Sequence, residues 1–199
     1  MVLLDGRVAV VTCAGQGIDA AIARGLRSPG AQVVVSDING DADMSVATDI
    51  GGTEVARDAT DEQQMRHLVA ATARDHGRRG LFVNSASMTP DASLQEVTGA
   101  DFDKAITVHL HAAWPGVREA SGVKPGQKTG SIVNISSLFG KSGNPGQTDR
   151  SAAKAWIVGL TKAAAKELAH HHVRVNAVHP SLTSTPMTAA AMPPEVLAE

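Results

Sequence analysis

The sequence predicts an α/β fold in which helices cover both faces of a parallel, doubly wound β-sheet. Short Val-rich runs bounded by Gly, Asp and Asn alternate with longer Ala-rich stretches whose apolar residues recur at helical spacing. Continuous apolar runs of this length are typical of parallel strands that are buried on both faces. Tyrosine is absent and aromatic residues make up only 3% of the chain, so the core must be built from Ala, Val, Leu and Ile.

The alternation predicts six strands separated by five helices. The strands are expected at residues 8–12, 32–36, 53–56, 81–84, 131–135 and 173–177. The helices are expected at residues 17–27, 42–49, 61–76, 102–120 and 151–169. Asp61, which follows Thr60, is typical of a helix start, because a side-chain oxygen there can accept a backbone N–H that the first turn leaves unpaired.

Two segments depart from this regular alternation. Pro115 and Gly116 lie within the fourth helical stretch, where proline removes a backbone donor and glycine adds chain entropy. We therefore expect that helix to kink or to stop early. The tail, residues 180–199, is rich in proline and is expected to form a loop with at most one short helix at the substrate side of the molecule.

The composition indicates one domain, residues 1–199, whose partner is a small molecule or another copy of the chain. A chain of 199 residues can bury one core, and its net charge of -2 is spread without a basic stripe for nucleic acid or an anionic membrane. Cys13 is the single cysteine, which excludes an intramolecular disulfide. The first residues, MVLLDGRVAVVT, show neither a charged leader nor a membrane-spanning run, so we expect a cytoplasmic location.

The loop after the first strand is typical of a dinucleotide site. Residues 10–19 read VVTCAGQGID, and glycines at such a loop let the backbone approach a pyrophosphate, while the helix N-terminus supplies unpaired N–H donors. Asp37 closes the second strand about 20 residues later, where a carboxylate accepts both ribose hydroxyls and repels a 2′-phosphate. Together they predict a Rossmann-type site that prefers NAD over NADP. The alternative is a plain turn followed by an unrelated Asp.

This loop and five later motifs resemble those of the short-chain dehydrogenase/reductases. TCAGQGID resembles the family's TGxxxGIG, with Cys13 and Asp19 in place of its outer glycines. The later motifs follow in the family's order: RDAT at 57–60, NSAS at 84–87 for NNAG, GSIVNISS at 130–137, RSAAK at 150–154 for YxxxK, and RVNAVHPS at 174–181 for RVNAVxPG. The resemblance covers about residues 5–192 and is closest to the 3-oxoacyl reductases and hydroxysteroid dehydrogenases.

The resemblance implies NAD-dependent interconversion of a ketone and a secondary alcohol. It also implies a homo-oligomer formed through the helices at 102–120 and 151–169. The residues that it implies for NAD contact lie at the ends of strands and in the following loops: Cys13, Gly15, Gln16, Gly17, Ile18, Asp37, Ile38, Asp58, Ala59, Asn84, Ala86, Ser87, Val108, Lys154, Pro180, Thr183 and Thr185.

The catalytic positions implied by the resemblance are only partly kept. Ser137 would hydrogen-bond the substrate oxygen, and Lys154 would hold the nicotinamide ribose. Arg150 stands in place of the proton-donating tyrosine, and it has no proton to exchange near neutral pH and adds a cation beside Lys154. His109 replaces an Asn of the family; it is either a proton carrier or a packed helix residue.

These departures predict either an impaired oxidoreductase or a non-catalytic module that binds a nucleotide, an anion or another subunit. Loss of a positioned general acid lowers the rate by about two to four orders of magnitude. Asp19 would stand close to the pyrophosphate, where two like charges about 4 Å apart repel by ~4 kcal/mol at an effective dielectric constant near 20.

Two further expectations concern the end of the chain. The family's last strand has no counterpart before Glu199, which would leave the sixth strand at an edge. His170, His171 and His172 follow one another on one segment, so their side chains point in different directions. We expect no metal there and interpret the run as a solvated helix end.

Overall fold

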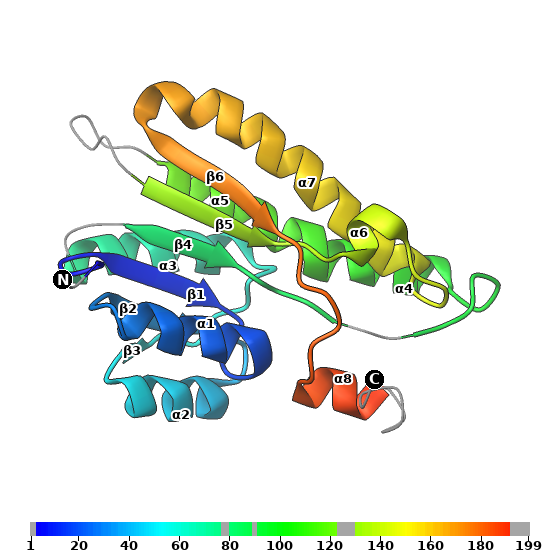
Figure 1. Ribbon diagram of the computed structural model, residues 1–199, viewed down its shortest axis with the longest axis horizontal. Helices are drawn as coiled ribbons and strands as arrows, with labels where there is room; N and C mark the ends of the chain where they lie inside the picture. Colours follow the sequence, from blue (N-terminus) through cyan, green and yellow to red (C-terminus); the bar gives the residue numbers. More distant parts are fainter. Residues whose placement is uncertain (1–2, 77–79, 89–90, 123–129, 192–199) are drawn as a thin grey trace.

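A computed structural model of the chain describes residues 3–76, 80–88, 91–122 and 130–191 (Figure 1). Its six strands form one parallel sheet in the order β3-β2-β1-β4-β5-β6, which confirms the predicted α/β class. The strands are β1 (Val8–Thr12), β2 (Gln32–Ser36), β3 (Thr53–Glu54), β4 (Leu81–Asn84), β5 (Gly130–Ile135) and β6 (Val173–Val178). As expected, β6 lies at an edge. The strand order reverses between β1 and β4, which is where α/β sheets of this kind open a crevice.

Helices cover both faces of the sheet because successive strand residues point to opposite sides. Val8, Val10 and Val34 pack on one face against α3 (Glu62–Asp75), α5 (Ala113–Ser121) and α7 (Thr148–Leu168). Ala9, Val11, Val33 and Val35 pack on the other face against α1 (Gly17–Arg27) and α2 (Gly40–Ile50). All five residues of β1 are buried, as the apolar run predicts for a central parallel strand.

Side-chain caps fix the starts of helices α3 and α4. Asp61 precedes α3 and its carboxylate accepts the N–H groups of Gln63 and Gln64, which confirms the predicted helix start. Thr98 precedes α4 (Gly99–Ile106) and forms a capping box with Asp101, in which each side chain accepts the other residue's backbone N–H.

The helix expected at 102–120 neither stops nor breaks at the proline. It begins earlier, as α4, widens into the π-helical turn η1 (Thr107–His111), and continues as α5 through Pro115 and Gly116. Within the widened turn the N–H of Ala112 donates to the carbonyl of Thr107, five residues back. Pro115 is the third residue of α5, just after the π-helical turn, where the backbone hydrogen-bonding pattern changes from i−5 to i−4. The prediction of an early stop is therefore wrong, and the irregularity precedes the proline.

Several boundaries also differ from the sequence prediction. The strand expected at 53–56 ends at Glu54, although the N–H groups of Val55 and Arg57 still donate to the carbonyls of Val35 and Asp37. Residues 139–142 form a short helix, α6 (Phe139–Ser142), that was not predicted. A Cβ on its Gly140 would lie 2.8 Å from the backbone of Lys154, so the glycine lets α6 approach α7 closely. A short 3-10 turn, η2 (Ala169–His171), follows α7, and the tail forms α8 (Pro186–Ala191).

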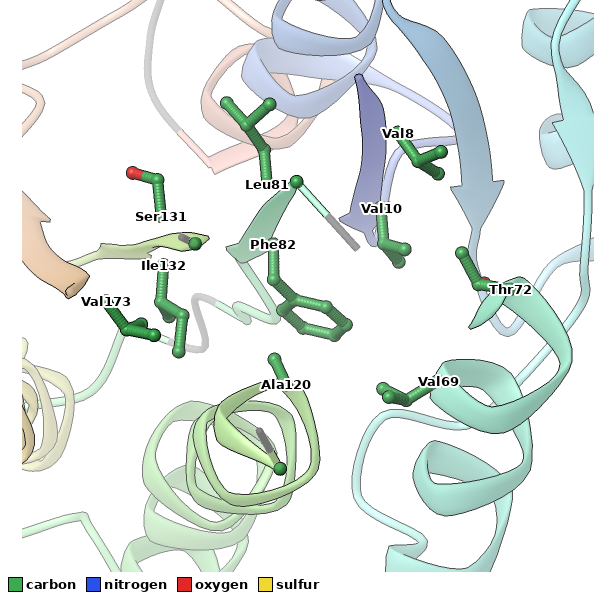
Figure 2. A pocket seen from close by; sticks show the side chains of 13 residues that line it. Val8, Val10, Val69, Thr72, Leu81, Phe82, Ala120, Ser131, Ile132 and Val173 are labelled. Carbon is green, nitrogen blue, oxygen red and sulfur yellow. The ribbon is translucent and has the colours of Figure 1, made fainter. Parts of the chain in front are cut away.

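A small apolar hollow lies at the amino ends of the strands, between the sheet and helices α3 and α5. Its volume is about 30 Å³, and its lining includes Val10, Val69, Phe82 and Ala120. Figure 2 shows the Phe82 ring reaching from β4 toward α5. A volume of this size holds about one water molecule, so the hollow is a packing defect of the core. Among the described residues, we find no helix with the length and apolarity needed to cross a bilayer.

Candidate functional site

A cleft with a volume of about 400 Å³ opens at the carboxyl ends of the strands, beside the point where the strand order reverses. The loops after β1, β2, β4, β5 and β6 form its walls, together with the first turns of α1 and α7. Thr185 to Thr188, at the start of α8, also line it. Ligands of open α/β sheets bind in this position, so the cleft is the candidate functional site.

The cleft brings together most of the residues that the sequence argument singled out. Those that line it are Cys13, Gln16, Gly17, Ile18, Asp19, Asp37, Ile38, Asp58, Ala59, Ala86, Ser87, Val108, Ser137, Arg150, Lys154, Pro180, Thr183 and Thr185. Gly15, Asn84 and His109 lie behind its walls. The lining also includes residues to which the sequence argument gave no role in the site, among them Arg57, Phe139, Gln147, Leu182 and Met187.

The loop between β1 and α1 presents free backbone donors to the cleft. Gln16 occupies the N-cap position of α1 without a side-chain cap, so the first N–H groups of the helix have no side-chain acceptor there. Gly17 has φ of +61°, a left-handed conformation that suits glycine. Cys13 adopts φ of +57°, which is strained for a residue with a Cβ. Burial raises the pKa of the Cys13 thiol, and Asp37 and Asp19 raise it further, so the thiol stays protonated.

Asp37 is held rigidly at the end of β2. Its two oxygens accept the N–H groups of Gly15 and Asn39, each at 3.1 Å. A Cβ at Gly15 would lie 2.7 Å from the Cβ of Ala42, so this position must be glycine for the loop to approach Asp37. The N–H of Asp37 donates to the Asp43 carboxyl at 2.5 Å. Burial raises the pKa of Asp43 to about 7, and the charge of Asp37 raises it further.

The carboxyl group of Asp19 lines the cleft beside Ser85, which directly follows β4. Its Oδ1 accepts the hydroxyl hydrogen of Ser85. Burial raises the pKa of Asp19 to about 7, although the Ser85 hydrogen bond and the charge of Lys154 favour the ionised form. The expected repulsion between Asp19 and a pyrophosphate therefore applies only to the ionised fraction of molecules and grows as the pH rises.

Ser137 and Lys154 both line the cleft. The Oγ of Ser137 accepts the N–H of Phe139 at 3.2 Å, which leaves its hydroxyl hydrogen free to donate. Lys154 is buried, and its Nζ donates to the carbonyl of Ile135 at 2.8 Å. Burial lowers the pKa of Lys154 to about 7, and Arg150 lowers it further, while Asp19 opposes the shift. Lys154 is thus a proton-exchanging group near neutral pH.

Arg150 lies in the first turn of α7 with its guanidinium in the cleft wall. Its Nη1 donates to Oε1 of Gln147 at 2.9 Å, and its Cζ lies 5.8 Å from the centre of the Phe139 ring. Burial lowers the pKa of Arg150, whereas Asp91 and Asp149 raise it. The sequence predicted that Arg150 would place a second cation beside Lys154. The charge of Arg150 lowers the pKa of Lys154, so Lys154 carries its own charge only in part of the molecules at neutral pH.

His109 lies in the π-helical turn, behind the cleft wall. It is 1% exposed, and the backbone of Met88 and Ala86 lies within hydrogen-bonding reach of its ring. Burial lowers the pKa of His109 to about 3, Lys154 and Arg150 lower it further, and the backbone of Met88 and Ala86 opposes the shift. His109 is therefore neutral at pH 7 and does not protonate readily, which argues for the packed-residue interpretation.

The residues of the cleft fit an adenine dinucleotide. The uncapped start of α1 and the close approach at Gly15 suit a pyrophosphate, and the fixed carboxylate of Asp37 suits a ribose. Asp58 accepts the N–H and the hydroxyl of Thr60 through Oδ1, which fixes its position at the far end of the cleft. Asp19 lies at the start of α1, so it suits a pyrophosphate best when its carboxyl is protonated.

The described residues contain no group of three His, Cys, Asp or Glu side chains that could hold a metal ion.

Comparison with known proteins gives consistent matches along the chain. A family model described as short chain dehydrogenase matches residues 7–195. The chain is similar to an uncharacterized oxidoreductase of Mycobacterium bovis, with 43% identity over 198 residues, which cover 98% of this chain and 80% of that protein. It is also similar to a 3-oxoacyl-(acyl-carrier-protein) reductase of Thermotoga maritima, with 37% identity over 190 residues, which cover 93% of this chain and 77% of that protein.

Solved structures show the same similarity in three dimensions. The 3-ketoacyl-(acyl-carrier-protein) reductase from Brucella melitensis, complexed with NADH, matches with a TM-score of 0.86 and 28% identity over 94% of this chain and 79% of that one. A dehydrogenase/reductase from Sinorhizobium meliloti matches with a TM-score of 0.87 and 35% identity over 94% of this chain and 76% of that one.

Proposed function

Because the chain belongs to the short-chain dehydrogenase family, we propose that it is an NAD(H)-dependent oxidoreductase that interconverts a small carbonyl compound and a secondary alcohol, at a reduced rate. One observation carries this proposal. A single cleft at the reversal of strand order combines the uncapped start of α1, the fixed carboxylate of Asp37, the free hydroxyl of Ser137 and the buried ammonium of Lys154. We also propose, from the sequence, that the protein acts in the cytoplasm.

Asp37 supports NAD rather than NADP as the cofactor. A carboxylate at the end of the second strand accepts ribose hydroxyls and repels a 2′-phosphate. Arg57 also lines the cleft, and an arginine there can accommodate that phosphate, but its Nη1 donates to the carbonyl of Ala56 at 2.6 Å. The start of α1 would hold the pyrophosphate, and Asp58 would contact the adenine. Bound NADH would supply the hydride for carbonyl reduction.

The substrate end of the cleft lacks a dedicated proton donor. The hydroxyl of Ser137 would donate a hydrogen bond to the substrate oxygen. Arg150 stands where the family resemblance places a tyrosine, and it keeps its proton near neutral pH. The proton that completes carbonyl reduction would come from the ammonium of Lys154, whose pKa is about 7, or from water. Without a phenol in place, we expect turnover about two to four orders of magnitude below that of an enzyme with a positioned acid.

The substitution Arg150→Tyr tests this proposal. We expect it to raise the rate of NADH oxidation with a panel of neutral ketones by about two to four orders of magnitude, because it restores a phenol one helical turn from Lys154. The matched control is Arg150→Phe, which adds the ring without its hydroxyl and should give no comparable gain. Equal rates for the two variants, or fast turnover by the unmodified chain, would contradict the proposal. Binding of NADH without turnover by any variant would favour a non-catalytic binding module.

We also propose that the protein acts as a homo-oligomer through helices α4, α5 and α7. Trp114 and Trp156 are 43% and 52% exposed, and they border a shared groove with Leu110, Pro115 and Leu160. An exposed apolar patch of this kind typically marks an interface. The molar mass in solution, measured by light scattering, should exceed that of one chain and should fall toward it in Trp156→Glu. A monomeric unmodified chain would contradict this assignment.

A further inference from the structure

The guanidinium of Arg150 leaves most of its hydrogen-bonding capacity unused. A guanidinium carries five N–H donors. Within the described part of the chain, this group donates one hydrogen bond, from Nη1 to Gln147, and takes part in no salt bridge. Its Nε is buried without a partner. Because Arg150 lines the same cleft as Ser137, a ligand bound there can reach a cation that forms no salt bridge with the carboxylates of residues 3–76, 80–88, 91–122 and 130–191.

The neighbours of Arg150 fix its position rather than neutralise it. The side-chain N–H of Gln147 donates to Oδ1 of Asp91 at 2.7 Å, which turns the other amide atom, Oε1, toward the guanidinium. Gln147 is 3% exposed, and Phe139 lies on another side of the guanidinium. The carboxylate of Asp149 accepts the backbone N–H of Arg150 at 2.7 Å. The guanidinium is thus preorganised before a ligand arrives.

We propose that Arg150 binds a carboxylate group of the substrate, so that the preferred substrates are oxo acids and their hydroxy acids rather than neutral ketones. This inference rests on the proposed function of the cleft. The planar fork of a guanidinium matches a carboxylate with two parallel hydrogen bonds. Asp91 and Asp149, whose charges act on Arg150, repel any anion that binds there, and they repel a dianionic phosphate more strongly than a singly charged carboxylate.

A purely structural role for Arg150 makes different predictions. Its contacts with Gln147 and Phe139 would stabilise the start of α7 whether or not a ligand is present. Substitution would then change the melting temperature but not the ability to distinguish an acid from its ester. If Arg150 binds the ligand, the protein should bind a carboxylate more tightly than an uncharged group of similar shape. A purely structural role predicts no such difference.

The test compares oxo acids with their methyl esters by isothermal titration calorimetry, with and without NADH. Suitable pairs are pyruvate, acetoacetate and levulinate with the corresponding esters. We expect at least one acid to bind about 10- to 100-fold more tightly than its ester, as for a charge-assisted pair of hydrogen bonds. Arg150→Met should abolish the difference, Arg150→Lys should keep part of it, and Arg66→Met, at an exposed ion pair, should keep all of it.

The possible outcomes separate this inference from the proposed function. If NADH binds but acid and ester bind equally, or if Arg150→Met keeps the difference, the carboxylate site is overturned and the cofactor site stands. If the acid preference depends on Arg150 but NADH does not bind, the carboxylate site stands and the oxidoreductase proposal fails. Tighter binding of inorganic phosphate than of any acid would overturn the choice of carboxylate. Melting curves identify any variant that fails to fold, in which case Arg150→Lys decides.

Discussion

Replacement of Asp19 by asparagine should make cofactor binding less sensitive to pH. The Asp19 carboxyl is buried at the start of α1, hydrogen-bonded to Ser85, and has a pKa raised to about 7. Its neutral form leaves the start of the helix available to a pyrophosphate, and its ionised form repels one. Affinity for NADH should therefore be full below pH 7 and should weaken as the pH rises through 7.

The size of this effect follows from the fraction of molecules that carry a neutral Asp19. With a pKa of about 7, that fraction is about nine-tenths at pH 6 and about one-tenth at pH 8. When only a fraction of the protein is competent to bind, the apparent Kd rises by the inverse of that fraction, so the Kd for NADH should rise about tenfold between pH 6 and pH 8. A repulsion of ~4 kcal/mol is large enough for the ionised form to contribute little binding.

Fluorescence titration of NADH at both pH values measures this directly. Asp19→Asn should tighten binding about tenfold at pH 8 and change it little at pH 6. Lys154 also loses charge in this range, and Asp37 and Cys13 face the same region, so a shallow slope should persist in the variant. Asp43→Asn is the matched control, because Asp43 has a similarly raised pKa but lies behind Asp37. An unchanged Kd at pH 8 in Asp19→Asn would refute the reasoning.

Three further predictions concern stability, measured by urea unfolding. The pKa of Asp43 is raised in the folded state, so the stability that its neutral form contributes is present at low pH and is lost as the pH rises through about 7. Asp43→Asn should therefore unfold at a higher urea concentration than the unmodified chain at pH 8, with a much smaller difference at pH 4. An equal gain at both pH values would contradict this. A Cβ at Gly116 would lie 1.9 Å from Oδ1 of Asn84, so Gly116→Ala should lower the free energy of unfolding by about 1–3 kcal/mol. Gly159→Ala, with open space around it, should raise the free energy of unfolding by up to about 1 kcal/mol. Similar effects of the two substitutions would exclude the clash. Thr98→Ala removes the capping box of α4 and should lose about 1 kcal/mol; no loss would show that the cap is redundant.

The sequence was sufficient to predict those features of the fold that depend on local patterns. The Val-rich runs located all six strands, and the carboxylate of Asp61 located the start of α3. The course of the chain around Pro115 was not predictable in the same way, because Gly116 packs closely against Asn84 of β4, a contact between residues far apart in the sequence. Helix α6 likewise depends on the tertiary contact of Gly140 with α7.

The candidate site was predictable in outline but not in its electrostatics. Residues that end strands, such as Asp37 and Ser137, were identifiable because parallel strands bring their carboxyl ends to one edge. The protonation behaviour of Asp19 and Lys154 depends on their burial, which the sequence does not specify. The contacts of Gln147 and Phe139 with Arg150 were also not predictable, because they depend on how the side chains pack in the folded chain. Both residues nevertheless lie near Ser137 or Arg150 in the sequence.

The central claim is that the cleft at the reversal of strand order holds NAD through the carboxylate of Asp37. Competitive titration with NADH and NADPH at pH 6, where Asp19 is mostly neutral, tests it most directly. We expect saturable binding of NADH, at least about tenfold tighter than that of NADPH, and loss of this preference in Asp37→Ala. Absence of saturable binding of either nucleotide, or tighter binding of NADPH, would contradict the claim.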